Sequence, residues 1–347
     1  MNDYISTNYT KFICVLLLFV LVTGPQAWSD QEKQKPDPNP FVGRWAFHLP
    51  GGAGWLELRQ EKGYLDADML WRGGSVMPVD HVYLQDQTLV VERHRLVTHK
   101  PSSEGAEPRK HTKVQRVELK HRDRDTLEGV SLTARNNGLG VDTVTYIATR
   151  IADLPPAPNL QNARYGDPIE FFNGENLEGW QVMNPGAGNG WRVENGILVN
   201  DPDALGKKHT SNLRTIATFE DFRLTLEVNV PQGSNSGVYL RGVYEVQVQD
   251  SYGKPCDSHN MGAIYSRITP RIAAEKPAGQ WQALDIILCD RHATVKLNGQ
   301  TIVDNQPLYG ITGGALWADE SKPGPIYLQG DHGPVSFRNI VFYPIRR

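Results

Sequence analysis

Apolar side chains alternate with polar ones in many short runs along this chain, and a period of two is typical of β-strands with one buried face. In the first part of the chain the pattern predicts eight strands. They lie around residues 45–49, 56–58, 65–71, 79–84, 89–91, 114–119, 127–132 and 143–148. Glycine-rich turns separate several of them. So many short strands predict an up-and-down barrel or a small sandwich over residues 41–151.

The segment 100–113 interrupts this pattern, because it is charged and contains two prolines. We expect a long hairpin loop there. A proline-rich stretch at 152–164 predicts an extended linker, after which alternation resumes and a second β-rich domain is expected over residues 165–347. No internal repeat and no helix longer than a few turns is predicted. The expected fold class is therefore all-β, with two domains.

The N-terminus has the features of a targeting segment. Lys11 precedes an apolar run at 12–22, and small residues follow as far as Ala27. The run is shorter than a bilayer span requires, so residues 1–27 are expected to be a signal peptide and residues 28–40 a disordered polar leader. The mature protein is then expected to be exported, to the periplasm or beyond the cell, without a membrane span.

Charge and cysteine content narrow the range of partners. The 36 basic and 39 acidic residues give a net charge of −3, which favours neither nucleic acid nor an anionic membrane. No glycine-rich phosphate loop is present, so no nucleotide cofactor is expected. Behind the leader only Cys256 and Cys289 remain. Whether they pair is open, and Cys289 at the end of an apolar run is expected to be a small buried thiol.

The segment 235–250, NSGVYLRGVYEVQVQD, carries the most chemical information. It predicts two strands joined near Gly242. Glu245, Gln247 and Gln249 are spaced by two and therefore share one face, while the valines between them face a core. Together with Arg241, these groups offer donors and acceptors in fixed directions. The segment therefore predicts a sheet face that binds a polyhydroxylated ligand such as a sugar.

Several separated motifs resemble those of known families. Gly43-Arg-Trp45 is similar to the first strand of lipocalin-like barrels. Residues 168–343 resemble the 3-keto-disaccharide hydrolase domain family, formerly a domain of unknown function. The motifs that carry this second resemblance stand in the family's order: FFNGENLEGW at 171–180, WRVENGIL at 191–198, FEDFRLTLE at 219–227, the segment 235–253, PAGQW at 277–281, LNG at 297–299 and LQGDHGPVSFRNI at 328–340.

The resemblance implies a concanavalin A-like jelly roll of two sheets with a concave, carbohydrate-binding face. It also implies a substrate glycoside whose C3 hydroxyl has been oxidised to a ketone by another protein, a sugar 3-oxidising dehydrogenase. Such a ketone acidifies the hydrogen on C2, so a base can remove it and the group on C1 can leave by elimination, with or without later addition of water. This route needs a base, an electrophile for the enolate oxygen and groups that position the ring.

His332 and Glu245 are the candidate catalytic residues. Imidazole titrates near neutral pH, and His332 follows an apolar strand-like pair, although it could instead cap the following turn. Glu245 shares its face with two glutamines. Asp250 and His332 are candidate ligands for a divalent metal ion, which would act as the electrophile; Asp250 is equally suited to a turn.

The remaining candidates would hold the substrate. Arg241, Gln247 and Gln329 offer directional hydrogen bonds to sugar oxygens. Trp281 could stack on a sugar ring, with core packing as the alternative. His259 lies on a loop and is either a substrate contact or exposed to solvent.

Other functions fit the same fold. A non-catalytic, lectin-like carbohydrate-binding protein would need the polar face but no base. A retaining β-glucanase would need paired carboxylates in a Glu-x-Asp-x-x-Glu run, and the chain has none. A structural or adhesive role, with the N-terminal domain as the functional part, is not tested by the sequence.

Overall fold

The computed structural model describes residues 39–99, 105, 107–206 and 210–346, and residues from Asn39 onward form one compact unit. The predicted signal peptide and nearly all of the predicted leader lie outside the described residues. The described chain is all-β, as predicted. Its helices are three short 3-10 turns, η1 (Leu160–Asn162), η2 (Pro185–Ala187) and η3 (Asp203–Leu205). No helix among these residues is long and apolar enough to cross a membrane.

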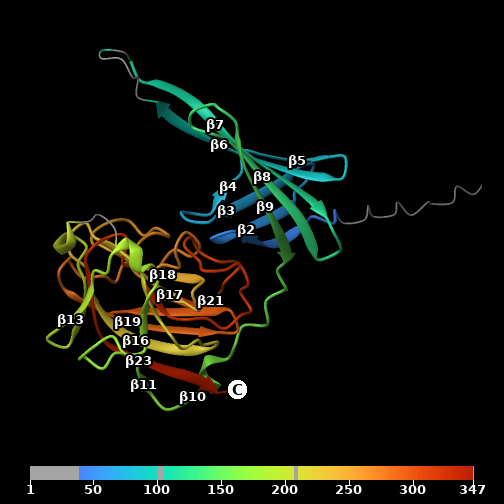
Figure 1. Ribbon diagram of the computed structural model, residues 1–347. Coiled ribbons are helices and arrows are strands. Elements are labelled where there is room, and N and C mark those ends of the chain that lie inside the picture. Colours follow the sequence, from blue (N-terminus) through green and yellow to red (C-terminus); the bar gives the residue numbers. More distant parts are fainter. Residues whose placement is uncertain (1–38, 100–104, 106, 207–209, 347) are drawn as a thin grey trace, which may run out of the picture. The chain divides into compact units, whose positions relative to one another are not determined.

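The first nine strands form one antiparallel sheet in the order β4-β3-β2-β1-β9-β8-β7-β6-β5. We call it the N-terminal sheet (Figure 1). Its strands are β1 (Gly43–Leu49), β2 (Gly52–Gln60), β3 (Leu65–Trp71), β4 (Met77–Pro78), β5 (His81–Gln85), β6 (Thr88–His99), β7 (Arg109–His121), β8 (Thr126–Ala134) and β9 (Val141–Arg150). All eight predicted strands are present. Except for β1 and β9, neighbours in the sheet follow one another in sequence, so it is an up-and-down meander and not a two-sheet sandwich.

The predicted long loop at 100–113 is shorter than expected. Strand β6 continues to His99, β7 begins at Arg109, and these two residues are paired. Backbone hydrogen bonds hold this ribbon together although most of its side chains near the tip are exposed, so a charged sequence does not prevent pairing. Apolar and polar residues alternate along a strand only where one of its faces is buried. Near the tip most side chains are exposed, so the sequence shows no such alternation there.

The N-terminal sheet has a core of its own, which includes Trp45, Phe47, Leu56 and Met69. Trp45 donates its indole N–H to the Phe41 carbonyl at 2.8 Å. The Arg150 guanidinium lies over the same ring, 4.2 Å from its centroid. The Gly-x-Trp motif therefore anchors the first strand to the last one.

The C-terminal part consists of two antiparallel sheets. The larger contains β13 (Trp191–Glu194), β14 (Ile197–Asn200), β23 (Val335–Arg346), β16 (Phe222–Asn229), β19 (Trp281–Cys289), β20 (His292–Leu297) and β21 (Gln300–Pro307), with β10 (Arg164–Tyr165) and β11 (Ile169–Glu170) pairing on β23. The smaller has the order β12 (Trp180–Val182), β15 (Leu213–Thr215), β22 (Tyr327–Leu328), β17 (Asn235–Leu240) and β18 (Tyr244–Gln249).

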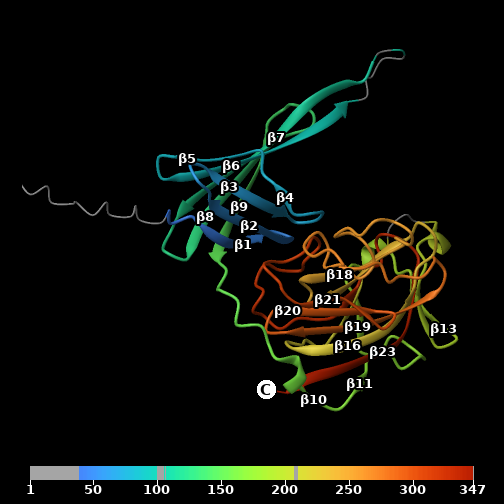
Figure 2. The ribbon, with the colours of Figure 1, turned by 180° about the vertical axis from the view of Figure 1, so that it is seen from behind.

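The two C-terminal sheets face one another across a single hydrophobic cluster. Figure 2 and Figure 1 both show β17 and β18 in one layer and β16, β19 and β23 in the other. Phe222 and Ile286 of the larger sheet and Val238 and Val246 of the smaller belong to this cluster, and all four are fully buried. The architecture is the predicted two-sheet jelly roll. Cys289 is buried and Cys256 exposed, and no disulfide joins them.

Candidate active site

The hairpin β17–β18 forms where the sequence predicted it, and its alternation decides which side chains face the site. Val246 and Val248 are fully buried on the core side. Glu245 and Gln247 project from the opposite face, where Tyr239 pairs with Glu245 and Gly237 with Gln247. A Cβ on Gly237 would lie 2.3 Å from a carboxylate oxygen of Glu245. Only glycine at this position leaves room for the glutamate.

Glu245 is a buried carboxyl group that makes no ion pair with a lysine or arginine of the described chain. The residue is 4% exposed, and burial raises its pKa to about 8 against the opposing effects of a tyrosine hydrogen bond and of His332. The Tyr239 hydroxyl lies 2.8 Å from Glu245 Oε2 and 2.7 Å from the Gly313 carbonyl oxygen. One hydroxyl hydrogen cannot serve both acceptors. A protonated Glu245 that donates to Tyr239 Oη satisfies all three groups, so the geometry favours the neutral acid.

A second tyrosine holds the ring of Tyr239 in place. The ring of Tyr327, on β22, stacks on that of Tyr239 with centroids 3.8 Å apart. Its hydroxyl donates to the Gly314 carbonyl at 2.8 Å. Both rings are buried, so each hydroxyl has one fixed direction. The carboxyl group of Glu245 therefore rests on a rigid aromatic support.

His332 and Asp331 form a pair in the loop between β22 and β23. Nδ1 of His332 lies 2.7 Å from Asp331 Oδ1, and this hydrogen bond raises the pKa of His332 above its ordinary value. With the carboxylate accepting, the proton of the neutral ring sits on Nδ1, an assignment that follows from the hydrogen bond. The other nitrogen, Nε2, then carries the lone pair and can act as a base or a ligand.

Amide groups surround these titratable residues. Oδ1 of Asn235 and Oε1 of Gln329 are buried and have no hydrogen-bond partner within the described residues. Gln247 receives the Val248 N–H on its oxygen at 3.0 Å, while its nitrogen makes only a long contact of 3.4 Å to Gln249. Buried polar atoms are rarely left unpaired, so these amides indicate a polar ligand.

One cavity of about 290 Å³ unites these groups. We call it the catalytic cavity. Its lining consists of Gly73, Gly74, Asn212, Asn235, Tyr239, Glu245, Gln247, Tyr265, Gly313, Gly314, Tyr327, Gln329, Asp331 and His332. Four of the residues singled out from the sequence therefore meet in one place: Glu245, Gln247, Gln329 and His332. A buried acid, an imidazole and several amides around a polar hollow suit proton transfer on a polyhydroxylated ligand.

Sequence comparison places this site in a family. The 3-keto-alpha-glucoside-1,2-lyase-like domain matches residues 167–342, which is just over half of the chain. The chain belongs to this family. Membership makes it a carbohydrate-active protein of the glycosyl hydrolase-like kind and confirms the resemblance drawn from the motifs. No curated protein sequence matches the chain.

Solved structures provide further similarities. A provisionally named glycosyl hydrolase from Parabacteroides distasonis ATCC 8503 is 28% identical, with 55% of this chain and 93% of that chain covered and a TM-score of 0.43. A second from the same organism is 21% identical over 52% and 94% of the two chains, with a TM-score of 0.41. The carbohydrate-binding module CBM66 from Bacillus subtilis is 12% identical over 47% and 93%, with a TM-score of 0.30.

Arg241 does not reach the catalytic cavity, so the prediction that it contacts substrate is wrong. It occupies the hairpin turn with a positive φ of 54°, outside the strand alternation, and is 2% exposed. Its guanidinium donates to the backbone carbonyls of Glu320 and Lys322. Arg241 therefore holds the loop before β22 in place.

Three further candidates also lie outside the lining of this cavity. Trp281 is on β19 of the larger sheet, where its ring packs against Arg338 at 4.1 Å. Asp250 closes the base of the hairpin by accepting the Gly233 N–H at 2.9 Å, so a role as metal ligand in the cavity is not supported. His259 has both ring nitrogens engaged, at 2.6 Å from Asp257 and 2.8 Å from Ser75, and touches the cavity-lining Tyr265 edge-on.

The sequence analysis did not single out Asn235, Tyr239, Tyr327 or Asp331 as site residues. The signal for two of them was present, because Asn235, Gly237 and Tyr239 share the alternation that selects Glu245 across the hairpin. No motif pointed to Gly73 and Gly74, which come from the N-terminal sheet.

Proposed function

We propose that this protein cleaves 3-keto glycosides by removing the C2 proton and expelling the group on C1. The observation that carries this proposal is the pairing, in one cavity, of a buried carboxyl group that holds its proton near neutral pH with an oriented imidazole. Titratable groups whose environments push their pKa values in useful directions are typical of acid–base catalysis.

The reaction balances without an external oxidant. The C2–H bond breaks, its proton passes to the base, and its electron pair forms the C2–C3 double bond as the C3 carbonyl oxygen becomes an enolate. The enolate then collapses: the C3 carbonyl re-forms, a C1–C2 double bond appears, and the C1–O bond breaks. The leaving oxygen takes up a proton. Addition of water across the new double bond would complete a net hydrolysis.

Each step has a suitable residue. His332 Nε2 is the base, since its other nitrogen is bound to Asp331. Neutral Glu245 is the acid: in the free protein its proton is directed to Tyr239 Oη, and with substrate bound it turns to the developing enolate oxygen. The unpaired amide oxygens of Asn235 and Gln329 accept hydrogen bonds from sugar hydroxyls. The tyrosine support keeps the acid in place.

In the described part of the chain, the carboxyl and imidazole groups of the cavity do not by themselves form a site for a divalent cation. Glu245, Asp331 and His332 do not bring three ligand atoms together within one coordination sphere; among the described residues that arrangement occurs only at Asp221, Cys289 and Asp290. The two unpaired amide oxygens would have to complete a site formed by His332 and Glu245. A cation bound there would stabilise negative charge on the substrate oxygens.

The cellular setting is also a proposal. The expected signal peptide would export the protein, and the ketone in its substrate would be introduced by a separate sugar 3-dehydrogenase. Unoxidised glycosides lack an acidic C2 hydrogen, so they should be inert whatever their leaving group.

The direct test offers purified protein a 3-keto aryl glucoside and 3-keto-trehalose, beside their unoxidised parents. We expect release of the leaving group from the keto forms only. His332→Ala should lower kcat by about 100-fold or more while binding persists, and His81→Ala, an exposed histidine of the N-terminal sheet, should change nothing.

Each outcome separates the alternatives. Binding without release in any condition would refute catalysis and favour the lectin-like alternative. Full activity in the presence of a chelator would refute the cation. Release from the unoxidised parents at a similar rate would refute the elimination chemistry.

A further inference from the structure

The N-terminal sheet contributes to the catalytic cavity through the loop between β3 and β4. Gly73 and Gly74 of this loop line the cavity opposite the hairpin. A Cβ on Gly313 would lie 2.2 Å from the Gly74 carbonyl oxygen, so the two backbones touch. The N–H of Gly314 donates to the Arg72 carbonyl at 3.0 Å. Because Gly313 accepts from Tyr239, the loop packs on the backbone that supports Glu245.

Contacts on either side hold this loop against the C-terminal part. Ser75 Oγ lies 2.8 Å from His259 Nε2, and the Val76 N–H donates to Ser266 Oγ at 2.9 Å. Trp55, on β2, is 2% exposed and belongs to the hydrophobic cluster of the C-terminal sheets. The Arg267 guanidinium lies over its ring at 4.1 Å. The loop is therefore a fixed wall of the site.

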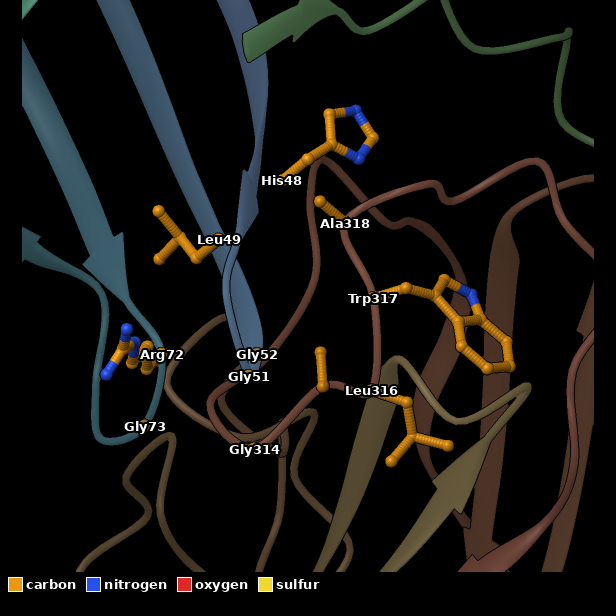
Figure 3. A pocket seen from close by; sticks show the side chains of 11 residues that line it. His48, Leu49, Gly51, Gly52, Arg72, Gly73, Gly314, Leu316, Trp317 and Ala318 are labelled. Carbon is orange, nitrogen blue, oxygen red and sulfur yellow. The ribbon is translucent and has the colours of Figure 1, made fainter. Parts of the chain in front are cut away.

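A second cavity continues from this wall. It has a volume of about 620 Å³ and shares Gly73 and Gly314 with the catalytic cavity. Figure 3 shows its two sides: His48, Leu49 and Arg72 from the N-terminal sheet, and Leu316 to Ala318 from the loop before β22, with the indole of Trp317 directed away from Leu49 and Arg72.

The sizes of the two cavities indicate that each receives a different part of the substrate. At about 290 Å³ the catalytic cavity is at the lower end of ligand pockets and matches one sugar ring. The group on C1 of that ring must lie outside it. The second cavity is about twice as large and begins at a shared wall, so it offers the nearest space for that group.

We propose that the N-terminal sheet supplies the leaving-group subsite, and that the cavity of Figure 3 receives the second sugar of a 3-keto disaccharide. This inference rests on the proposed function, because it assigns the part of the substrate that is expelled. It gives the N-terminal sheet a role in specificity, which the family match does not cover.

The lining suits a sugar. Arg72 uses one guanidinium nitrogen on the Pro50 carbonyl at 2.9 Å, and further N–H donors remain on the group. His48 contacts Thr149 Oγ1 through Nε2 at 2.9 Å, which leaves Nδ1 for a ligand. Leu49 and Leu316 add apolar surface for the C–H faces of a ring.

His48 allows a selective test, because it lines the second cavity but not the catalytic cavity, and its side chain is exposed. In full-length protein carrying His332→Ala, so that substrates persist, calorimetry would measure the Kd of 3-keto-trehalose and of methyl 3-keto-α-glucoside. We expect the disaccharide to bind at least about tenfold more tightly. His48→Trp should remove this advantage and leave the methyl glucoside within about twofold.

Two controls separate blocking from misfolding. His48→Gln keeps a polar side chain that can still hydrogen-bond a sugar, and Leu139→Trp places the same large ring on an exposed loop of the N-terminal sheet, where Leu139 is 77% exposed. Both should preserve the advantage of the disaccharide. If His48→Trp abolishes binding of both ligands or weakens neither, or if the parent binds neither ligand, the subsite is overturned.

Turnover by the protein with His332 intact, measured on the same two compounds, tests the proposed function separately. Selective loss of disaccharide binding in His48→Trp, without any release by the protein with His332 intact, would support the subsite and refute cleavage. Release of both leaving groups, with Kd values that His48→Trp leaves unchanged, would support cleavage and refute the subsite.

Discussion

Two buried glutamates lie on opposite sides of the hairpin β17–β18, and each is hydrogen-bonded to a tyrosine of that hairpin. Glu245 Oε2 lies 2.8 Å from the Tyr239 hydroxyl, and Glu320 Oε2 lies 2.8 Å from the Tyr244 hydroxyl. Both residues are 4% exposed, and burial raises the pKa of both. Their immediate surroundings are otherwise different.

Glu320 is surrounded by arginines. Arg291 contacts it at 3.2 Å, and the charge of Arg267 also counteracts the effect of burial on its pKa. Glu245 pairs with no arginine of the described residues and opens onto a cavity with unpaired amides. A buried acid with cations serves the fold, whereas a buried acid without them is costly to ionise and is retained where its proton is used.

The largest expected effect separates these two roles. Glu245→Gln should lower kcat by about 100-fold or more on a 3-keto glycoside, because an amide is a much weaker acid than a carboxyl group and stabilises the developing enolate less, while the protein stays folded. Glu320→Gln should keep the catalytic groups but lose at least about 2 kcal/mol of unfolding free energy, because buried arginines lose their carboxylate. Kinetics and urea unfolding on both variants measure this contrast.

The interpretation fails if the two variants exchange effects. Full activity in Glu245→Gln would remove this residue from the mechanism. An inactive but fully stable Glu320→Gln would show that the arginine-rich cluster, and not the cavity, carries the chemistry.

Strand alternation decided which site residues could be predicted from the sequence. Strand alternation has a fixed period, so the faces of Glu245, Gln247 and the valines between them followed directly from spacing. Arg241 was assigned to the site on the same reasoning, but it sits in the turn, where alternation no longer determines direction. Tyr239 was missed because an aromatic residue on a strand also fits a core.

Local sequence patterns could not predict contacts between residues that are far apart in the chain. The loop at Gly73 and Gly74 looks like an ordinary turn in the sequence, and its place in the cavity depends on packing against Gly313, about 240 positions later in the chain. Likewise, Trp281 begins a strand, and sheet order, which no local pattern gives, places that strand in the layer without the site.

The second expected effect concerns stability and pH. Because the folded pKa of Glu245 is about 8 and its ordinary value is 4.5, the folded chain keeps this proton in a range where the unfolded chain has released it. Stability from this group is therefore present at low pH and is lost as pH rises through that range. Glu245→Gln has no such proton. Its unfolding free energy, relative to that of the unsubstituted protein, should rise by up to roughly 1.4 kcal/mol per pH unit between about pH 5 and 8.

Urea unfolding at several pH values gives this difference directly, and other titrating groups cancel in the comparison. Glu320→Gln is the matched control, because Glu320 is also a buried glutamate but contacts Arg291. Parallel curves for Glu245→Gln and the unsubstituted protein across this range would show that Glu245 ionises normally, and its assignment as the acid would then be wrong.

The smallest effect should come from Asp331, which acts through His332. Its hydrogen bond raises the pKa of His332 and fixes the tautomer, so Asp331→Asn should shift the acidic limb of the kcat/KM profile to lower pH and weaken the base. We expect about a tenfold loss of kcat/KM at about pH 7.5. The alkaline limb, assigned to Glu245, should move less, because the charge of Asp331 is the smallest of the causes that act on the pKa of Glu245. A purely structural Asp331 would lower the whole profile without moving its acidic limb. A shift confined to the alkaline limb would exchange the roles of the two groups, making Glu245 the base and His332 the acid.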